Sequence, residues 1–334
     1  MTTDAIQSLP DASLPLDQES ASAAFSAIMD GGVDDEDIAR FLVQLADRGE
    51  TVDEIAAAAS VLRGRASTIE APAGAIDVCG TGGDGLHSLN VSTAVAIVVA
   101  ACGVPVAKHG NRAASSRSGA ADVLAELGVD VDAPAEKVEA CLHELGIGFL
   151  FAAKHHGAMA RVAPVRRAIG RRTIFNLLGP LANPAGVTRQ LVGVPATRWV
   201  EPIAQALARL GCERAMVVHG SDGLDELTVT GDSVVAELSA GEVVGSFVSP
   251  LEAGLSVWPL SDLTGGAPAE NAVALRDLLT GARNAYRDIV LLNVAGALNV
   301  AGVVDGWAPG VARAADAIDS GAAADLLSRW ASYR

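Results

Sequence analysis

The sequence predicts an α/β protein with a small helical N-terminal domain and a larger α/β domain around a mainly parallel sheet. Apolar residues between residues 20 and 70 recur with a helical period. From Ile76 onward, short β-branched runs alternate with longer stretches rich in Ala and Leu. This alternation is typical of strand–helix units around a parallel sheet. A chain of 334 residues is long enough for one large domain or two unequal ones.

Three short helices are expected in the N-terminal part. Their apolar faces would consist of Ala21, Phe25, Ile28 and Met29, then Ile38, Phe41, Leu42 and Leu45, and finally Ile55, Ala58, Val61 and Leu62. Acidic residues at Val33-Asp34-Asp35 and Val52-Asp53 are typical of helix caps. The segment Ala71-Pro72-Ala73-Gly74 predicts a hinge before the larger part.

The larger part should contain several short strands, an antiparallel excursion over residues 234–256, and a helical C-terminus. Strands are expected at residues 76–79, 104–108, 147–151, 190–194, 214–218 and 228–229. Helices are expected between residues 267 and 281 and again after Arg287.

Composition excludes several classes of protein. Half of the chain is hydrophobic but only 4% is aromatic, so the core must consist of Ala, Val, Leu and Ile. A net charge of −16 disfavours nonspecific nucleic-acid binding. The longest apolar run, residues 91–107, is too short and too interrupted for a membrane span, and no secretory signal is visible. Four scattered cysteines fit buried reduced thiols and a cytoplasmic protein.

Two glycine-rich segments are the main candidates for a binding site. The first runs from Asp77 to Gly85 and is followed by Asn90-Val91-Ser92-Thr93; the second is Lys108-His109-Gly110-Asn111-Arg112-Ala113-Ala114-Ser115-Ser116. Glycine lets the backbone approach a phosphate closely, and N–H groups at a helix start bind anions. Taken singly, each segment could be an ordinary turn or a solvated loop. Together, with Lys and Arg in the second, they indicate a ligand with more than one phosphate group.

Two charged pairs complete the candidate site. Asp225-Glu226 follows an apolar strand and a glycine turn, and paired carboxylates suit Mg²⁺ bound to a substrate phosphate. An adjacent acidic pair on a loop is also expected by chance in an acidic chain. Arg166 and Arg167 could bind a carboxylate through two parallel hydrogen bonds, or could lie on a solvated helix face.

The chain resembles the anthranilate phosphoribosyltransferases from about residue 20 to about residue 330. Besides the glycine segments, the resemblance rests on Val162-Ala163-Pro164-Val165-Arg166-Arg167, residues 173–184, Val218-His219-Gly220, Gly223-Leu224-Asp225-Glu226 and residues 287–293. Lys108-His109-Gly110-Asn111-Arg112 is also similar to pyrimidine nucleoside phosphorylases, but those enzymes have a different first loop.

The resemblance implies a discontinuous helical domain and a ligand cleft between the domains. The helical domain would comprise residues 1–72 plus roughly 161–182, and the α/β domain residues 73–160 and 183–334. The family usually forms homodimers through the helical domain, so a homodimer is expected here.

The resemblance also assigns the site. Phosphoribosyl pyrophosphate (PRPP) would be bound by Gly80, Gly83, Asp84, Ser88, Asn90, Val91, Ser92, Thr93, Lys108, His109, Gly110, Asn111, Arg112, Ala113, Ala114, Ser115, Ser116 and Ala120. Anthranilate would contact Gly80, Asn111 and Arg166, and Mg²⁺ would be held by Ser92, Asp225 and Glu226. The chain departs from the family pattern at Arg117, where Lys is common, and at Ala120, where a Ser hydroxyl usually contacts the donor.

The implied reaction transfers the 5-phosphoribosyl group of PRPP to the amine of anthranilate, the second step of tryptophan biosynthesis from chorismate. No general base is assigned, because the aromatic amine is already neutral at pH 7. The expected partners are the two small-molecule substrates, with neither nucleic acid nor membrane. A pyrimidine nucleoside phosphorylase and a nucleic-acid-binding paralogue are the alternatives.

Overall fold

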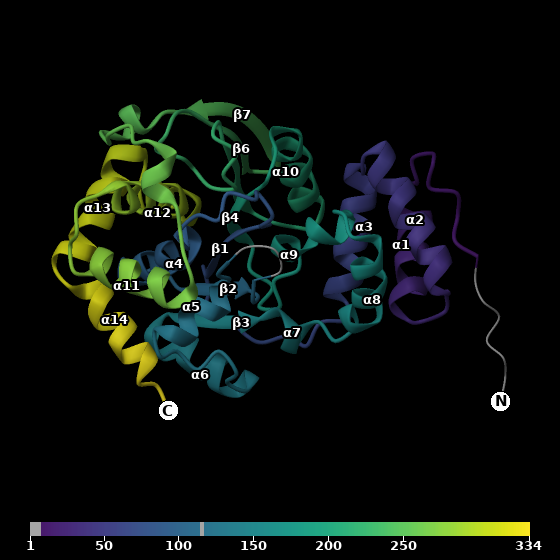
Figure 1. Cartoon of the computed structure of the whole chain (residues 1–334), viewed down its shortest axis with the longest axis horizontal. Coiled ribbons are helices and arrows are strands. Elements are labelled where there is room, and N and C mark those ends of the chain that lie inside the picture. Colours follow the sequence, from purple (N-terminus) through teal and green to yellow (C-terminus); the bar gives the residue numbers. More distant parts are fainter. Residues whose placement is uncertain (1–7, 114–116) are drawn as a thin grey trace.

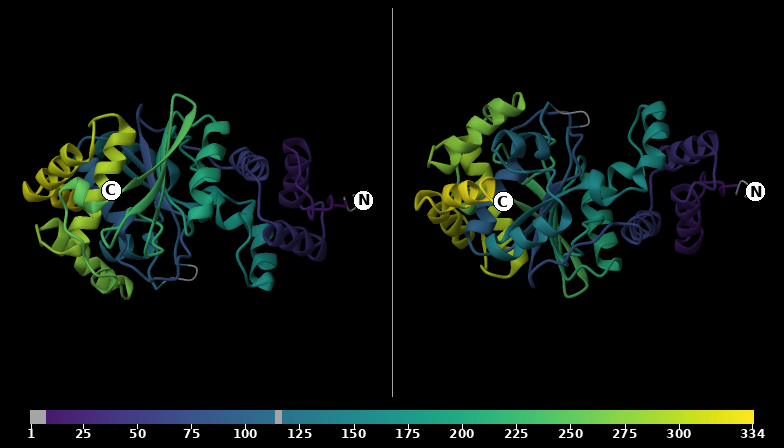
Figure 2. Two further views of the ribbon diagram at one scale, coloured as in Figure 1. Left: turned by 90° about the horizontal axis from the view of Figure 1, so that it is seen from above. Right: turned by 90° about the horizontal axis from the view of Figure 1, so that it is seen from below.

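The computed structural model describes residues 8–113 and 117–334 (Figure 1). A group of helices lies at one end of the molecule, and an α/β body forms the rest (Figure 2). The predicted α/β class with a mainly parallel sheet and an N-terminal helical part is confirmed. No helix within the described ranges is both long and apolar enough to cross a membrane.

The N-terminal helices are α1 (Gln18–Met29), α2 (Asp35–Arg48) and α3 (Val52–Arg63). The Asp34 side chain caps α2 by accepting the N–H of Asp37. The cap of α3 is Thr51 rather than the predicted Val52-Asp53 pair: Thr51 accepts the N–H of Glu54, whose carboxylate accepts the N–H of Thr51. This reciprocal pair satisfies two backbone donors that a helix start leaves free.

A later segment packs against these three helices. It contains α8 (Met159–Ile169), the 3₁₀ turn η1 (Ile174–Asn176) and α9 (Leu178–Leu181). Phe175 on η1 meets Phe25 edge-on, with 6.1 Å between ring centroids. Residues 162–182 therefore share one apolar core with α1–α3, and Figure 1 shows α8 beside them.

The sheet has seven strands in the order β3-β2-β1-β4-β5-β6-β7. The strands are β1 (Ile76–Gly80), β2 (Val106–Gly110), β3 (Ile147–Phe151), β4 (Arg189–Gly193), β5 (Arg214–Gly220), β6 (Ser233–Ser239) and β7 (Glu242–Val248). The first five are parallel, and the predicted antiparallel excursion is confirmed in β6 and β7.

The predicted strand at residues 228–229 is wrong. Thr228 lies in the loop after β5, where its N–H donates to Ser233 Oγ (2.9 Å) and its hydroxyl donates to Asp222 Oδ2 (2.6 Å). Side-chain hydrogen bonds of this kind compete with a strand ladder. The apolar pattern of Leu227 and Val229 reflects burial of a loop instead.

The two faces of the sheet bury different helices. Val78, Leu191 and Val218 pack into one core with α4 (Val91–Ala101) and α12 (Ala285–Ala301). Val192 and Val217 face the opposite core, which contains α10 (Val200–Arg209) and continues into the N-terminal helices. Alternate strand residues point to opposite faces, so β4 and β5 each contribute to both cores.

The remaining helices surround the α/β body. They are α5 (Ala120–Glu126), α6 (Ala135–Leu145), α7 (Ala152–His155), α11 (Pro268–Leu279), α13 (Trp307–Asp319), α14 (Ala322–Ala331), and the 3₁₀ turns η2 (Thr197–Trp199), η3 (Pro250–Ala253) and η4 (Leu260–Leu263).

The strand order reverses between β1 and β4. Ligands of open α/β sheets bind beyond the carboxyl ends of the strands at such a reversal. The loops after β1, β2 and β5 all leave this edge, and they carry both glycine segments and the Asp225-Glu226 pair.

Candidate active site

The acidic pair lies directly beside the first glycine loop and the start of α4. Asp225 Oδ2 accepts the N–H of Gly82 (2.7 Å), and Glu226 Oε1 accepts the N–H of Ser92 (3.1 Å). A Cβ atom on Gly80 would lie 2.2 Å from Asp225 Oδ2. Only a residue without a side chain can bring the loop this close to the carboxylate. The structure thus places Ser92, Asp225 and Glu226, the residues predicted to hold the metal, beside the first glycine loop.

Burial makes the negative charge of this pair costly. It raises the pKa of Asp225 to about 7, with a further contribution from the nearby charge of Asp84. The pKa of Glu226 is raised well above its usual range, first by burial and then by repulsion from Asp225. Two buried carboxylates that repel one another favour a bound cation.

The donor set fits Mg²⁺. Within residues 8–113 and 117–334, no group of three or more His, Cys, Asp or Glu side chains is placed to hold a metal by itself. Mg²⁺ is usually bound by one or two carboxylates, with water and substrate phosphates completing the shell. Asp225 and Glu226, with the hydroxyl of Ser92, match that pattern.

Lys108 lies beneath the first loop and is almost completely buried. Its ammonium donates to Val78 O (2.8 Å) and to Ser92 Oγ (3.2 Å). Burial lowers its pKa, and the charge of Asp77 opposes that shift. Lys108 therefore orients the Ser92 hydroxyl and joins β1, at Val78, to the start of α4.

The described part of the second loop, up to Ala113, is held by hydrogen bonds and an ion pair. The backbone N–H of His109 donates to Asp77 Oδ1 (3.1 Å), and its Nδ1 donates to the carbonyl of Gly179 (3.0 Å). Nε2 of His109 is buried without a partner in the described structure. Asp122 accepts the N–H of Ala113 (2.9 Å) and pairs with Arg112 (3.2 Å). The predicted ligands Ala114, Ser115 and Ser116 lie outside the described residues.

Asn111 and Arg112 are joined by a hydrogen bond within the loop. Asn111 Oδ1 accepts the N–H of Arg112 (2.8 Å), and both side chains are exposed. Gly110, the last residue of β2, has no room for a side chain, since a Cβ there would lie 2.8 Å from the Phe149 ring and 3.2 Å from the Cβ of Ala120. Ala120 begins α5, and its Cβ lies close to Gly110 of the second loop.

Asn90 ties the start of α4 to more distant helices. Its side-chain oxygen accepts from the hydroxyl of Ser118 (3.1 Å) and from Asn271 Nδ2 (2.9 Å), while its carbonyl accepts from Tyr286 (3.0 Å). The amide is therefore occupied in fixing the helix start. Ser88 forms a short antiparallel bridge with Thr264. Thr93 and Val91 are buried in the first turn of α4.

Arg166 and Arg167 lie on α8 in the helical part. Arg166 is half-buried on α8, with its guanidinium carbon 5.8 Å from the centre of the Phe175 ring. Burial lowers its pKa, and none of the described acidic side chains pairs with it. Arg167 is exposed. An unpaired, partly buried arginine suits an incoming carboxylate.

Arg172 is a residue that sequence reasoning did not place in the site. Arg172 lies in the helical part, and its Nη1 donates to the carbonyls of Gly82 (3.0 Å) and Gly83 (3.1 Å) in the first glycine loop. The sequence signal is only that Arg172 belongs to a dense basic cluster. A partner about 90 residues away cannot be identified from that cluster.

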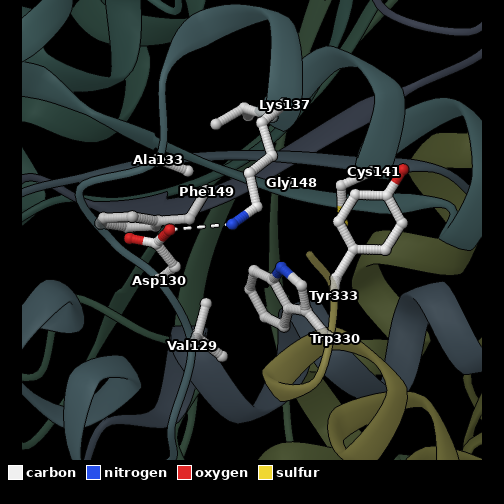
Figure 3. Close-up of a pocket in the computed structure, with 10 residues that line it drawn as sticks. Val129, Asp130, Ala133, Lys137, Cys141, Gly148, Phe149, Trp330 and Tyr333 are labelled. Carbon is white, nitrogen blue, oxygen red and sulfur yellow. Dashed lines mark hydrogen bonds and ion pairs between the residues drawn. The ribbon is translucent and has the colours of Figure 1, made fainter.

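Figure 3 shows a small hollow elsewhere in the α/β body. Trp330 and Tyr333 border it beside an ion pair between Lys137 and Asp130 (2.9 Å). Its volume is only about 20 Å³, enough for roughly one water molecule. No glycine-loop residue lines it, so it does not extend the site described above.

Comparisons with known proteins identify both parts of the chain. Residues 73–324 match the α/β domain of a glycosyl transferase family, and residues 3–66 match the helical bundle domain of that family. The anthranilate phosphoribosyltransferase of Novosphingobium aromaticivorans is 56% identical over 322 residues, covering 96% of this chain and 98% of the relative. That of Rhodospirillum rubrum is 58% identical over 315 residues, covering 94% and 91%.

Solved structures give the same result. The anthranilate phosphoribosyltransferase of Thermus thermophilus superposes with a TM-score of 0.92 at 44% identity, covering 97% of this chain and 99% of that one. The Saccharomyces cerevisiae enzyme in complex with PRPP and Mg has a TM-score of 0.87 at 27% identity, covering 95% and 93%. The predicted family is confirmed by sequence and by structure, and the chain belongs to the anthranilate phosphoribosyltransferases, a family of glycosyl transferases.

Proposed function

We propose that the chain transfers the 5-phosphoribosyl group of PRPP to the amine of anthranilate. The observation that carries the proposal is the contact between the first glycine loop and the Asp225-Glu226 pair. A diphosphate held at this loop would lie next to the two carboxylates. The yeast relative bound to PRPP and Mg, and another yeast structure bound to 4-fluoroanthranilate, support this assignment.

The diphosphate would bind at the start of α4. The first N–H groups of a helix lack partners within the helix, and its dipole favours an anion there. The first glycine loop adds backbone N–H groups from Gly83 to Gly85. Lys108 holds the hydroxyl oxygen of Ser92 at the start of α4, and the N–H of the same residue donates to Glu226.

Mg²⁺ would be held by Asp225, Glu226 and Ser92. When bound, it supplies positive charge to the departing pyrophosphate. The chain itself holds the two carboxylates against the backbone of Gly82 and Ser92. Both carboxylates are buried there, so few water molecules compete for them.

Anthranilate would lie between the two halves of the site. Arg166 would take its carboxylate, while Asn111 and Gly80 would border the ring. Charge-assisted pairs of this type fix the orientation of a carboxylate. The unpartnered Nε2 of His109 accepts hydrogen bonds, because Nδ1 carries the proton, and it would be available near the second loop.

The reaction breaks the bond between C1 of the ribose and the pyrophosphate oxygen and forms a bond from C1 to the amine nitrogen. Pyrophosphate leaves with the electron pair of the broken bond, and the new ammonium releases one proton to solvent. No side chain needs to act as a general base. Holding the amine near C1 can lower the barrier by roughly 7–11 kcal/mol in favourable intramolecular cases.

The proposed function is tested by following anthranilate fluorescence with PRPP and Mg²⁺. Loss of fluorescence that depends on both PRPP and Mg²⁺ is the expected result. Release of base from uridine or thymidine by inorganic phosphate, without anthranilate consumption, would identify a pyrimidine nucleoside phosphorylase instead. A salt-sensitive gel shift of single-stranded DNA would indicate the nucleic-acid-binding alternative.

Domain division, assembly and location are also part of the proposal. We assign residues 1–72 and 161–182 to a helical domain and the rest to the α/β domain, supported by the shared core of α8 with α1–α3. We further propose a cytoplasmic homodimer formed through the helical domain. Sedimentation equilibrium would test the dimer, and a monomer at micromolar concentration would reject it.

A further inference from the structure

Arg172 connects the helical part to the first glycine loop. It lies between α8 and η1, and its neighbours Ile174 and Phe175 are buried in the core of the N-terminal helices. Its side chain leaves that core, and Nη1 donates to the carbonyls of Gly82 (3.0 Å) and Gly83 (3.1 Å). The guanidinium thus holds two consecutive peptide groups of the loop.

The two glycines leave room for this contact. Gly82 and Gly83 have φ values of 70° and 78°, in the left-handed region. A Cβ atom on Gly83 would lie only 2.0 Å from Arg172 Nη1. Any larger residue at position 83 would therefore displace the guanidinium as well as strain the backbone.

Peptide geometry determines what the contact does to the neighbouring N–H groups. In a planar trans peptide, the carbonyl and the N–H point in opposite directions. The carbonyls of Gly82 and Gly83 point toward Arg172, so the N–H groups of Gly83 and Asp84 point away from it. Neither N–H has a hydrogen-bond partner among the described residues. Consecutive free N–H groups in a turn bind anions.

The same stretch is held from its other side. The N–H of Gly82 donates to Asp225 Oδ2 (2.7 Å). Gly82 and Gly83 are therefore fixed between a carboxylate of the α/β body and an arginine of the helical part. Little freedom remains for the peptide plane that carries the Gly83 N–H.

We propose that Arg172 is a positioning residue for the diphosphate of the donor. It turns the N–H groups of Gly83 and Asp84 toward the diphosphate by holding the carbonyls on the opposite side. The inference rests on the proposed function, because it assumes that a diphosphate binds at this loop. Arg172 acts through the loop backbone, so its removal affects the donor and not the acceptor.

Arg171 provides a matched control. It is the preceding residue, it is exposed, and it pairs with Asp47 on α2 (2.6 Å). None of its described contacts reaches the glycine loop. Removing its charge therefore alters the net charge of the same segment without changing the loop.

The test compares Arg172→Gln, Arg172→Lys and Arg171→Gln with the wild type. Steady-state kinetics give KM for PRPP and for anthranilate, and calorimetry gives the affinity for inorganic pyrophosphate with Mg²⁺. We expect Arg172→Gln to weaken PRPP and pyrophosphate about ten-fold, the loss expected of a hydrogen bond from a charged group. Anthranilate KM should change less than about two-fold, and Arg171→Gln should match the wild type.

Arg172→Lys separates geometry from charge. Lysine keeps the positive charge but is one atom shorter and lacks the planar guanidinium. We expect a pyrophosphate affinity between those of the wild type and Arg172→Gln, and this variant also replaces Arg172→Gln if the latter does not fold. Wild-type affinity in Arg172→Lys would show that charge alone suffices and would overturn the positioning role.

Two other outcomes would reject the inference. Unchanged pyrophosphate affinity in Arg172→Gln would show that the loop keeps its conformation without the guanidinium. Equal weakening of both substrates, with a lower thermal midpoint, would show that Arg172 only supports the packing of the helical part. If the wild type binds pyrophosphate but consumes no anthranilate, the proposed function fails while the pyrophosphate measurement still tests Arg172.

Discussion

At the scale of single residues, the site consists of charges that burial makes costly until a ligand arrives. Asp225 and Glu226 repel one another in a buried position, and Arg166 is half-buried without an acidic partner among the described residues. The negative pair follows β5 in the α/β body, whereas the positive residue lies on α8 in the helical part. Each therefore favours a ligand of opposite charge. The acidic pair suits a cation that also binds phosphates, and Arg166 suits a carboxylate.

Arg166→Ala should weaken anthranilate much more than PRPP. A hydrogen bond to a charged group contributes roughly 1.5–3 kcal/mol, which corresponds to about ten- to a hundred-fold in affinity. Separate titrations of the two substrates would measure this. Arg167→Ala is the control, because that side chain is exposed and should matter little. Equal loss for both substrates would instead assign Arg166 to the packing of α8 against Phe175.

Asp225→Asn combined with Glu226→Gln should abolish Mg²⁺-dependent turnover and leave the fold intact. The amides keep the size of the side chains and remove two buried negative charges, so the thermal midpoint without metal should stay the same or rise. Turnover at limiting Mg²⁺ and thermal unfolding would be measured together. Near wild-type turnover would show that the pair does not hold the metal.

At the scale of elements, close approaches between strands and loops give the site its shape. A Cβ atom on Gly193, the last residue of β4, would lie 1.5 Å from the backbone oxygen of Asp225. This clash is with main chain and not with a flexible side chain. The end of β4 therefore lies in direct contact with the backbone of Asp225, and Gly193 is what leaves room for that contact.

Gly193→Ala should destabilise the protein and reduce Mg²⁺-dependent activity together. Overpacking of a close contact typically costs about 1–3 kcal/mol. Urea unfolding and a Mg²⁺ titration of activity would measure the two effects. Gly245→Ala on β7 is the matched control, since a Cβ there would meet nothing within 4 Å. Unchanged stability in Gly193→Ala would mean that the loop with Asp225 shifts freely.

The elements also show what the sequence could predict. Helices α1–α3 and the parallel strands follow from local apolar patterns, so their predicted positions agree with the structure to within a few residues. The strand prediction at Thr228 is wrong because a loop held by side-chain hydrogen bonds leaves the same apolar pattern as a strand. The contact of Arg172 with Gly82 and Gly83 joins residues far apart in the chain, and no local pattern encodes it. The two glycine segments and the Asp225-Glu226 pair stand out as local residue patterns, whereas the ligand expected at each residue follows from the family resemblance.

At the scale of the whole molecule, the helical part is not an independent body. Its apolar core runs through α10 to one face of the sheet, where Val192, Val217 and Leu238 belong to the same cluster as Phe25 and Phe41. Unfolding the N-terminal helices would expose that face to water. Any closing motion over the site must therefore preserve this packing.

Two buried histidines should each lower stability as the pH drops below about 6.5, a contribution that the raised pKa values of Asp225 and Glu226 oppose. Burial lowers the pKa of His109 to about 3 and that of His156 to about 4. Above pH 6.5 both are neutral whether the chain is folded or unfolded. Between about 6.5 and 4, only the unfolded chain takes up these protons, so it gains up to about 1.4 kcal/mol per pH unit for each imidazole.

His156→Gln should therefore reduce the dependence of the free energy of unfolding on pH over that window. Urea unfolding at a series of pH values from about 4.5 to about 7.5 would measure the slope. His143→Gln is the control, because His143 is exposed on α6. An identical slope in wild type and His156→Gln would show that the buried imidazole takes up its proton in the folded state.

The burial of Lys108 has a consequence for chemical labelling. The chain contains only three lysines, at positions 108, 137 and 154, and Lys108 is 1% exposed whereas the other two reach solvent. An amine-directed acylating reagent should modify Lys137 and Lys154 quickly and leave Lys108 intact, as peptide mass spectrometry would show. Acylation of Lys108 would require the first glycine loop and the start of α4 to separate. Its rate, with and without PRPP, would therefore report how often this site opens in solution.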